Sequence, residues 1–297
     1  MAVEADPAEL EQLANLSEIT SVEEDKLAKV SLAESVPLIG GPAAWDSGYS
    51  GVGQTVAILD TGVDKTHLFL AGKVVSEACY SSNYPPEGAT SICPGGVTES
   101  TADGSALPYA GTCPTGECDH GTHVAGIVAG TGGNFSGVAK DASLIAIQVF
   151  SRFDNPAACG STAPCTMSYQ SDEILGLERV YALRNTYNIA SVNMSLGGGR
   201  YYDQSTCDSD NSSMKTAIDN LRAAGIATVI AAGNESYLDS MSEPACISSA
   251  LSVGATWDEA NWIDPWCSSG SSYTSVDQIA CYSNSAAFLN LLAPGSA

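Results

Sequence analysis

The stretch T-V-A-I-L-D-T-G-V-D, residues 55–64, joins a continuous apolar run to a carboxylate. Continuous rather than alternating apolarity over Thr55–Leu59 is typical of a strand that is buried on both faces, as in a parallel sheet. Asp60 must therefore leave the core, be hydrogen-bonded or act chemically, and Gly62 permits the tight turn that exposes it. Taken alone, an Asp at a strand end is more often a turn or helix-cap residue than a catalytic one.

Further apolar runs of the same kind alternate with helical segments along the chain. They are Ser143–Val149, Ala190–Met194, Ile226–Ala231, Ala250–Ala255 and Phe288–Leu292. The segments between them predict helices over His123–Gly130, Asp172–Tyr187 and Ser213–Ala224. This order predicts an α/β fold, a doubly wound, mostly parallel sheet with helices on both faces. In such sheets the chemistry gathers at the carboxyl ends of the strands.

A second motif, D-H-G-T-H-V-A-G, occupies residues 119–126. Its small residues predict a helix that packs closely against a sheet, with His120 at the amino end, where its side chain can project into a cleft. The helix dipole there is expected to lower the pKa of His120 and to favour the neutral imidazole that a general base needs. His123, one turn on, is expected to point toward the buried side of the helix as a structural residue. His67 lies in a polar turn and is expected only to be hydrogen-bonded.

Two further loops follow strands. Asn234 ends V-I-A-A-G-N, where its amide can point at a developing oxyanion, although a lone A-G-N is more simply a turn. Ser195, Leu196 and Gly197 follow the strand residues V-N-M. Their glycine-rich, extended backbone can pair with a peptide substrate by strand addition.

Taken in this order, D-T-G-V-D, H-G-T-H-V-A-G, N-M-S-L-G-G and A-A-G-N closely resemble the motifs of the subtilisin-like serine proteases, over about residues 36–297. The resemblance implies a serine endopeptidase in which Asp60 orients the base, His120 is that base and Asn234 donates to the oxyanion. It also implies that two segments flank the primary specificity pocket, namely Ser195, Leu196 and Gly197 on one side and Ala231, Ala232 and Gly233 on the other.

The nucleophile departs from the family pattern. In the family it lies in a G-T-S-M-A helix start that follows an A-P-G such as Ala293-Pro294-Gly295, and neither G-T-S-M nor G-x-S-x-G occurs in the 297 residues. We therefore expect an incomplete peptidase domain over residues 31–297, inactive by itself. The alternative is a non-catalytic homologue that binds peptides in a cleft without the serine. A nucleotide-binding α/β protein is disfavoured, because D-T-G-V-D is not a glycine-rich phosphate loop.

The remaining segments suggest how the chain is organised. Residues 1–30 resemble the end of the family's inhibitory propeptide followed by a linker, and residues 26–50 read as a connecting stretch. The segment 78–118 is rich in Ser, Gly, Pro and Cys and reads as a stapled surface insertion. The chain starts without the pattern of a signal peptide, so we expect the natural N-terminus to lie upstream.

Charge and cysteine content indicate the setting. The 34 Asp and Glu residues against 11 Lys and Arg give a net charge of −23, which argues against nucleic acid or an anionic membrane as a partner. Polypeptide substrates and the protein's own propeptide are the partners that the resemblance implies, for a monomer. Ten cysteines favour disulfides in an oxidising compartment and thus a secreted protein. Plausible pairs are Cys79/Cys93, Cys113/Cys118, Cys159/Cys165 and Cys267/Cys281.

We expect no cofactor to be required. Structural calcium is common in the family, but the sequence places no calcium site and assigns no metal ligand. Among other possible metals, a structural zinc site is disfavoured, because the cysteines form no C-x-x-C pair.

Overall fold

The computed structural model describes residues 32–111, 118–160, 163–260 and 274–296. The chain divides into two compact units, Met1–Val30 and Ser31–Ala297. The predicted propeptide remnant, residues 1–30, lies outside the described residues, so the fold below is that of the second unit.

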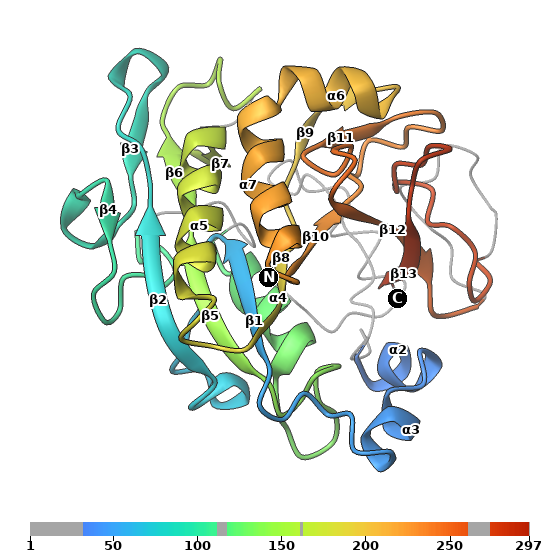
Figure 1. Cartoon of the computed structure of the whole chain (residues 1–297). Helices are drawn as coiled ribbons and strands as arrows, with labels where there is room; N and C mark the ends of the chain where they lie inside the picture. The colour runs from blue at the N-terminus through green and yellow to red at the C-terminus, as the bar shows by residue number, and fades with distance from the viewer. Residues whose placement is uncertain (1–31, 112–117, 161–162, 261–273, 297) are drawn as a thin grey trace, which may run out of the picture. The chain divides into compact units, whose positions relative to one another are not determined.

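An eight-stranded sheet forms the centre of this unit (Figure 1). In sheet order its strands are β13 (Leu291–Ser296), β12 (Leu251–Trp257), β10 (Ala227–Ala231), β8 (Ile189–Met194), β1 (Thr55–Asp60), β5 (Ser143–Gln148), β2 (Val74–Tyr80) and β4 (Glu99–Ser100). Neighbouring strands are parallel except for β2 and β4. The predicted, mostly parallel sheet is confirmed. β2 and β5 lie on one side of β1, and β8 and β10 lie on the other. The order of the strands therefore changes direction at β1, and in such sheets a crevice opens there at the carboxyl ends of the strands.

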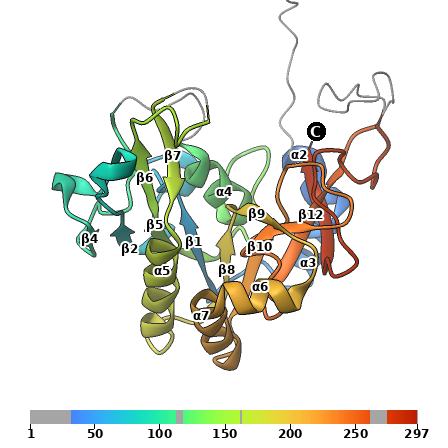
Figure 2. The same cartoon turned by 90° about the horizontal axis from the view of Figure 1, so that it is seen from above.

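Helices cover both faces of the sheet, and Figures 1 and 2 agree on their sides. On one face lies α4 (His120–Ala129), and on the other lie α5 (Gln170–Leu183) and α7 (Ser212–Ala223). Alternate residues of β1 join different cores: Val56 and Ile58 pack with α4, while Ala57 and Leu59 pack with the cluster that includes α5 and α7. Burial of β1 on both faces explains its continuous apolar sequence.

Shorter elements complete the unit. A three-stranded antiparallel sheet consists of β3 (Ala89–Ser91), β6 (Phe150–Phe153) and β7 (Cys165–Ser168), and a two-stranded one of β9 (Gly198–Tyr201) and β11 (Met241–Glu243). Another helix is α6 (Gln204–Asp210), and short 3₁₀ turns are η1 (Leu68–Leu70), η2 (Pro85–Glu87) and η3 (Pro94–Gly96).

Three sequence predictions about elements are corrected. The stretch predicted as a connection contains two short helices, α2 (Leu32–Leu38) and α3 (Gly41–Asp46). The proline of α3 lies in its first turn, where no hydrogen bond is lost, and Pro37 lies near the end of α2. The predicted surface insertion 78–118 begins inside β2, where Cys79 is fully buried. The last strand covers Leu291–Ser296 rather than Phe288–Leu292.

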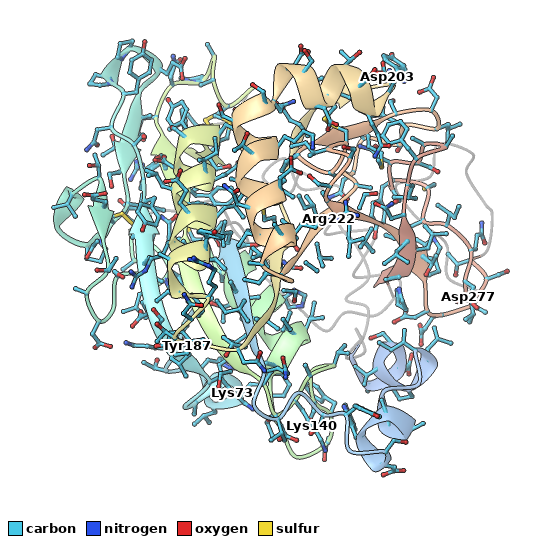
Figure 3. All side chains as sticks on the ribbon, viewed as in Figure 1. Lys73, Lys140, Tyr187, Asp203, Arg222 and Asp277 are labelled. Carbon is cyan, nitrogen blue, oxygen red and sulfur yellow. A yellow bond between two sulfur atoms is a disulfide. The ribbon has the colours of Figure 1, made fainter. Side chains whose placement is uncertain are left out.

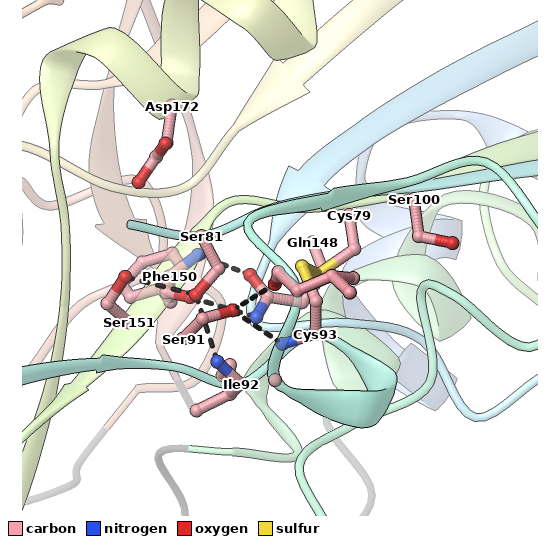
Figure 4. Close-up of a disulfide and its surroundings, with 12 residues drawn as sticks. Cys79, Ser81, Ser91, Ile92, Cys93, Ser100, Gln148, Phe150, Ser151 and Asp172 are labelled. Carbon is pink, nitrogen blue, oxygen red and sulfur yellow. Dashed lines mark hydrogen bonds between the residues drawn. A yellow bond between two sulfur atoms is a disulfide. The ribbon is translucent and has the colours of Figure 1, made fainter. Parts of the chain in front are cut away.

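The described disulfides agree with two of the predicted pairs and add one. Cys79–Cys93 and Cys159–Cys165 are confirmed, and Cys207–Cys246 was not predicted. Cys118 and Cys281 are also disulfide-bonded, but their predicted partners lie outside the described residues. Beside the first disulfide, the Ser81 hydroxyl accepts a hydrogen bond of 3.0 Å from the Ile92 amide (Figure 4). The end of β2 is therefore tied to the loop after β3 both covalently and by hydrogen bonds.

The amino ends of the parallel strands lie at the opposite end of the sheet from the crevice. Three residues that precede strands lie there: Lys73 before β2, Lys140 before β5 and Tyr187 before β8. Figure 3 shows the three near one another at this end of the sheet. The hydroxyl of Tyr187 donates to the carbonyl of Val75 at 3.0 Å. Within the described part of the chain, no helix has the length and apolarity needed to cross a bilayer.

Candidate active site

Asp60 is the last residue of β1, and it is completely buried. Its Oδ1 accepts a hydrogen bond of 2.7 Å from the amide of Thr61. The Thr61 hydroxyl in turn accepts from the amide of Gly121 at 3.0 Å and donates to the carbonyl of Cys118 at 3.2 Å. The D-T-G sequence thus fixes both the carboxylate and the start of α4.

His120 is the first residue of α4, and its Nδ1 lies 2.8 Å from Oδ1 of Asp60. A carboxylate can only accept, so this contact places the hydrogen on Nδ1 and leaves Nε2 free to take a proton. The hydrogen bond from His120 to Asp60 raises the pKa of His120, against the effect of burial, and the charges of Asp60 and Asp119 raise it further. The predicted lowering of this pKa by the helix dipole is therefore wrong.

Close approach of α4 to β1 depends on Gly121. A Cβ at this position would lie 2.4 Å from the carbonyl oxygen of Gly62 and 3.0 Å from Cβ of Asp60. Both are groups that cannot move without moving β1 or its turn. Glycine at this position is what lets His120 reach Asp60.

A cleft of about 560 Å³ opens beside His120. Its lining includes Thr61, Ser195, Leu196, Gly197, Ala231, Gly233 and Asn234, so the structure brings nearly all of the predicted site residues together. Ala232 is the exception. It is 1% exposed and packs in the core, because strand residues alternate in direction and its neighbours Ala231 and Gly233 take the cleft side.

The fully buried side chain of Asn284 forms hydrogen bonds with the backbone of the loop that carries Asn234. Oδ1 of Asn284 accepts from the amides of Glu235 and Tyr237, both at 3.0 Å. Its Nδ2 donates to the carbonyl of Ala232 at 3.1 Å and to the carboxylate of Glu235 at 2.5 Å. Asn234 itself is exposed, and no hydrogen bond within the described residues engages its amide. The amide is therefore available to a ligand in the cleft.

The other two histidines, His67 and His123, lie outside the lining of the cleft. His123 is exposed on α4, so its predicted burial is wrong. His67 accepts a hydrogen bond of 3.3 Å from the amide of Phe69, as expected for a turn residue. No group of three or more His, Cys, Asp and Glu side chains within the described ranges is arranged to hold a metal ion.

The sequence reasoning missed the acidic side chains of the cleft. Glu173, Glu235 and Glu243 line it together with the predicted residues. Glu173 lies in the first turn of α5, where an acidic residue is common because it complements the helix dipole, so nothing in the pattern marked it as a site residue. Burial raises the pKa of Glu173 to about 7, and the charges of Glu243 and Asp172 act in the same direction.

An oriented imidazole, a buried carboxylate behind it and a free amide on the same cleft are the parts of an acyl-transfer site. The comparisons with known proteins agree with that class. Residues 51–297 match the subtilase family, and the chain belongs to this family of serine peptidases.

Individual relatives cover different parts of the chain. The minor extracellular protease Vpr of Bacillus subtilis is 31% identical over 241 residues, which are 80% of this chain and 24% of that protein. Subtilisin E of the same species is 29% identical over 99% of this chain and 61% of its own length. An extracellular serine proteinase of a Thermus species is 27% identical, over 99% of this chain and 57% of its own length. The chain therefore spans less than two thirds of each of these relatives.

Solved structures show the same fold. Sphericase aligns with a TM-score of 0.55 at 24% identity, over 83% of this chain and 67% of that one. A protease of Pseudoalteromonas arctica aligns with a TM-score of 0.60 at 23% identity, over 86% and 66% of the two chains.

Proposed function

We propose that this chain is the greater part of the peptidase domain of a serine endopeptidase, with Asp60 and His120 as two members of its catalytic triad. The observation that carries the proposal is the 2.8 Å hydrogen bond between His120 Nδ1 and Asp60 Oδ1 at the edge of a cleft that Asn234 also lines. The nucleophilic serine is supplied by residues that follow Ala297, since the sequence contains no G-T-S-M or G-x-S-x-G.

Each group has a role in the proposed reaction. The serine Oγ attacks the substrate carbonyl carbon while His120 Nε2 takes its proton, and the amide of Asn234 donates to the oxyanion that forms. The C–N bond then breaks as His120 returns the proton to the leaving amine, which yields an acyl-enzyme. A water molecule, deprotonated by His120, then attacks the ester carbonyl carbon. The bond from this carbon to the serine Oγ breaks as His120 returns the proton to Oγ, which regenerates the free serine. Asp60 holds the imidazole in position and stabilises its protonated form. Protein groups supply every step, so hydrolysis needs no cofactor.

The setting of the enzyme is part of the same proposal. The substrate is an extended polypeptide whose backbone lies along Ser195–Gly197, with a side chain between this segment and Ala231 and Gly233. The disulfides at Cys79–Cys93, Cys159–Cys165 and Cys207–Cys246 support an oxidising, extracellular setting. Residues 1–30 are the end of a propeptide that inhibits the domain, and the domain acts as a monomer.

Hydrolysis of an unstructured protein tests the proposal with two forms of the chain. The longer natural protein should cleave it and should be labelled by a serine-reactive phosphonate, whereas the 297-residue chain should do neither. Asn234→Ala in the longer form should lower kcat by about 10²–10³-fold, the loss measured when the oxyanion donor of subtilisin itself is removed. KM should change little, because the amide acts mainly on the transition state.

Two results would contradict it. Stoichiometric labelling of one serine within the 297-residue chain would show that the nucleophile has been misplaced. A longer protein without a G-T-S motif and without hydrolysis would replace the enzyme by a peptide-binding homologue.

A further inference from the structure

Three carboxylates line the cleft without a role in the proposed hydrolysis, and one of them, Glu235, accepts hydrogen bonds from Ser242 and Asn284. The other two are Glu173 and Glu243. Glu173 comes from the first turn of α5 and Glu243 from the end of β11, and both line the cleft. Glu173 is only 7% exposed, and the hydroxyl of Ser168 donates to its Oε1 at 2.5 Å. Within the described residues no other hydrogen bond reaches this carboxylate, although a buried carboxylate has room for several donors.

Glu243 lies beside the segment proposed to bind the peptide backbone. Its carbonyl oxygen is 2.7 Å from the place where a Cβ on Gly197 would stand, and its Oε1 is 3.6 Å from the corresponding place on Gly199. The charge of Glu243 also acts on Glu173, so the two carboxylates are close enough to repel each other. A peptide that pairs with Ser195–Gly197 would therefore pass next to a pair of acids.

No cation of the described residues neutralises this pair. The cleft lining contains neither Lys nor Arg, and the ion pairs described elsewhere occupy other carboxylates. The contrast with other buried acids is informative. Glu77 is paired with Lys65 at 2.5 Å, and Asp172 accepts two hydrogen bonds from Ser82. A buried carboxylate without such partners is costly, and a cation that enters the cleft would offset that cost.

We propose that Glu173 and Glu243 form a subsite that binds a cationic side chain, Arg or Lys, of the polypeptide substrate. The inference rests on the proposed function, since only a peptide laid along Ser195–Gly197 brings a side chain to this place. The cationic group must be carried by a long, apolar side chain, because Glu173 is only 7% exposed. Arginine fits best, since its guanidinium presents five donors in a planar fork, against three donors for the ammonium of lysine.

Matched peptides test the subsite. In an uncharged peptide frame, one arginine is moved through each position in turn, and each peptide has a twin with citrulline, which keeps the shape and removes the charge. Dissociation constants are measured by fluorescence anisotropy with the 297-residue chain, and kcat/KM with the longer protein. At one position arginine should bind at least about tenfold more tightly than citrulline, as expected for hydrogen bonds between charged groups.

Substitutions in the protein test whether Glu173 and Glu243 cause this preference for arginine over citrulline. Glu173→Gln and Glu243→Gln should each reduce the arginine-to-citrulline ratio to about twofold or less, without weakening the citrulline peptides. Glu178→Gln removes the same charge from an exposed position of α5 and should keep the full ratio. A ratio near one at every position, or a ratio that survives both cleft substitutions, would overturn the subsite while neutral peptides still bind and are cleaved. If no peptide of either kind binds or is cleaved, the proposed function fails and the subsite with it.

Discussion

At the scale of single residues, the buried carboxylates of this protein differ in the donors that they meet. Asp172 accepts two hydrogen bonds from Ser82. Lys65 and the amide of Gly104 both contact Oε2 of Glu77, while its buried Oε1 has no hydrogen-bond partner within the described residues. Oδ1 of Asp60 accepts hydrogen bonds from the amide of Thr61 and from the imidazole of His120, the proposed base. Glu173 keeps a single hydroxyl donor within the described residues. Because burial raises the pKa of Glu173 to about 7, its protonation should respond to pH near neutrality.

Glu173→Gln should stabilise the fold at pH 8 and have little effect near pH 4.5. The pKa of Glu173 in the fold is about 7, above its ordinary value of 4.5, so the folded state binds this proton more tightly than the unfolded state. Its contribution to stability is therefore fully present below pH 4.5 and is lost as the pH rises to 7. With about 1.4 kcal/mol per pKa unit, the ionised carboxylate costs about 3 kcal/mol at pH 8, which Gln avoids while it keeps an acceptor for Ser168.

Urea denaturation of both forms at pH 4.5 and pH 8 measures this difference. Glu178→Gln on the exposed side of α5 serves as the control and should be nearly neutral at both values. An equal effect of Glu173→Gln at the two pH values would show that the carboxylate is not desolvated.

At the scale of elements, the site depends on how closely α4 approaches β1, and Gly121→Ala tests this dependence. The new Cβ would meet the carbonyl oxygen of Gly62 at 2.4 Å, so α4 must shift away from Asp60. We expect a loss of about 1–3 kcal/mol in the free energy of unfolding, as for an overpacked core. NMR titration should show the pKa of His120 falling back toward 6.5, because the hydrogen bond to Asp60 that raises it lengthens.

Gly126→Ala is the matched control on the same helix. Its Cβ would find only the ring of Phe69, at 3.4 Å, which is ordinary contact, and alanine favours the helix by about 0.5–1 kcal/mol. This variant should be neutral or more stable and should leave the titration of His120 unchanged. If the two substitutions behaved alike, close packing at Gly121 would not be what positions the base.

The elements also show where sequence reasoning succeeds. Strands β1, β5, β8, β10 and β12 were predicted because burial on both faces leaves a continuous apolar run. β2 was missed since Glu77 interrupts its run, and the partners of Glu77, Lys65 and the amide of Gly104, are distant in the sequence. β13 contains Pro294 and Gly295, which an edge strand accepts because one of its sides is unpaired.

The site was predictable to the same extent and for related reasons. Asp60, His120 and Asn234 lie within two residues of a glycine in short local motifs, which the sequence displays directly. The cleft positions of Glu173 and Glu243 depend on which loops the sheet brings together, and no local pattern records that. Ala232 was misplaced because adjacent residues of one strand face opposite sides.

At the scale of the whole molecule, disulfides tie loops to the sheet that the sequence leaves far apart. Cys207–Cys246 joins α6 to the segment after β11 across 39 residues, and both cysteines are fully buried in the larger core. Cys159–Cys165 closes a loop of only 6 residues between partly exposed positions. The first cross-link therefore restricts the unfolded chain far more than the second.

Removing the two disulfides one at a time should reveal this difference. By chain entropy, replacing Cys207 and Cys246 with Ala should cost roughly 4 kcal/mol, and replacing Cys159 and Cys165 roughly 2 kcal/mol. The first pair also loses buried sulfur atoms from the core, which adds to its cost, so the ordering should hold even where the magnitudes change. Denaturant unfolding under non-reducing conditions measures both. A larger loss from the short loop than from the long one would show that native contacts of the segment around Cys159, rather than the entropy of the unfolded chain, decide what these cross-links contribute.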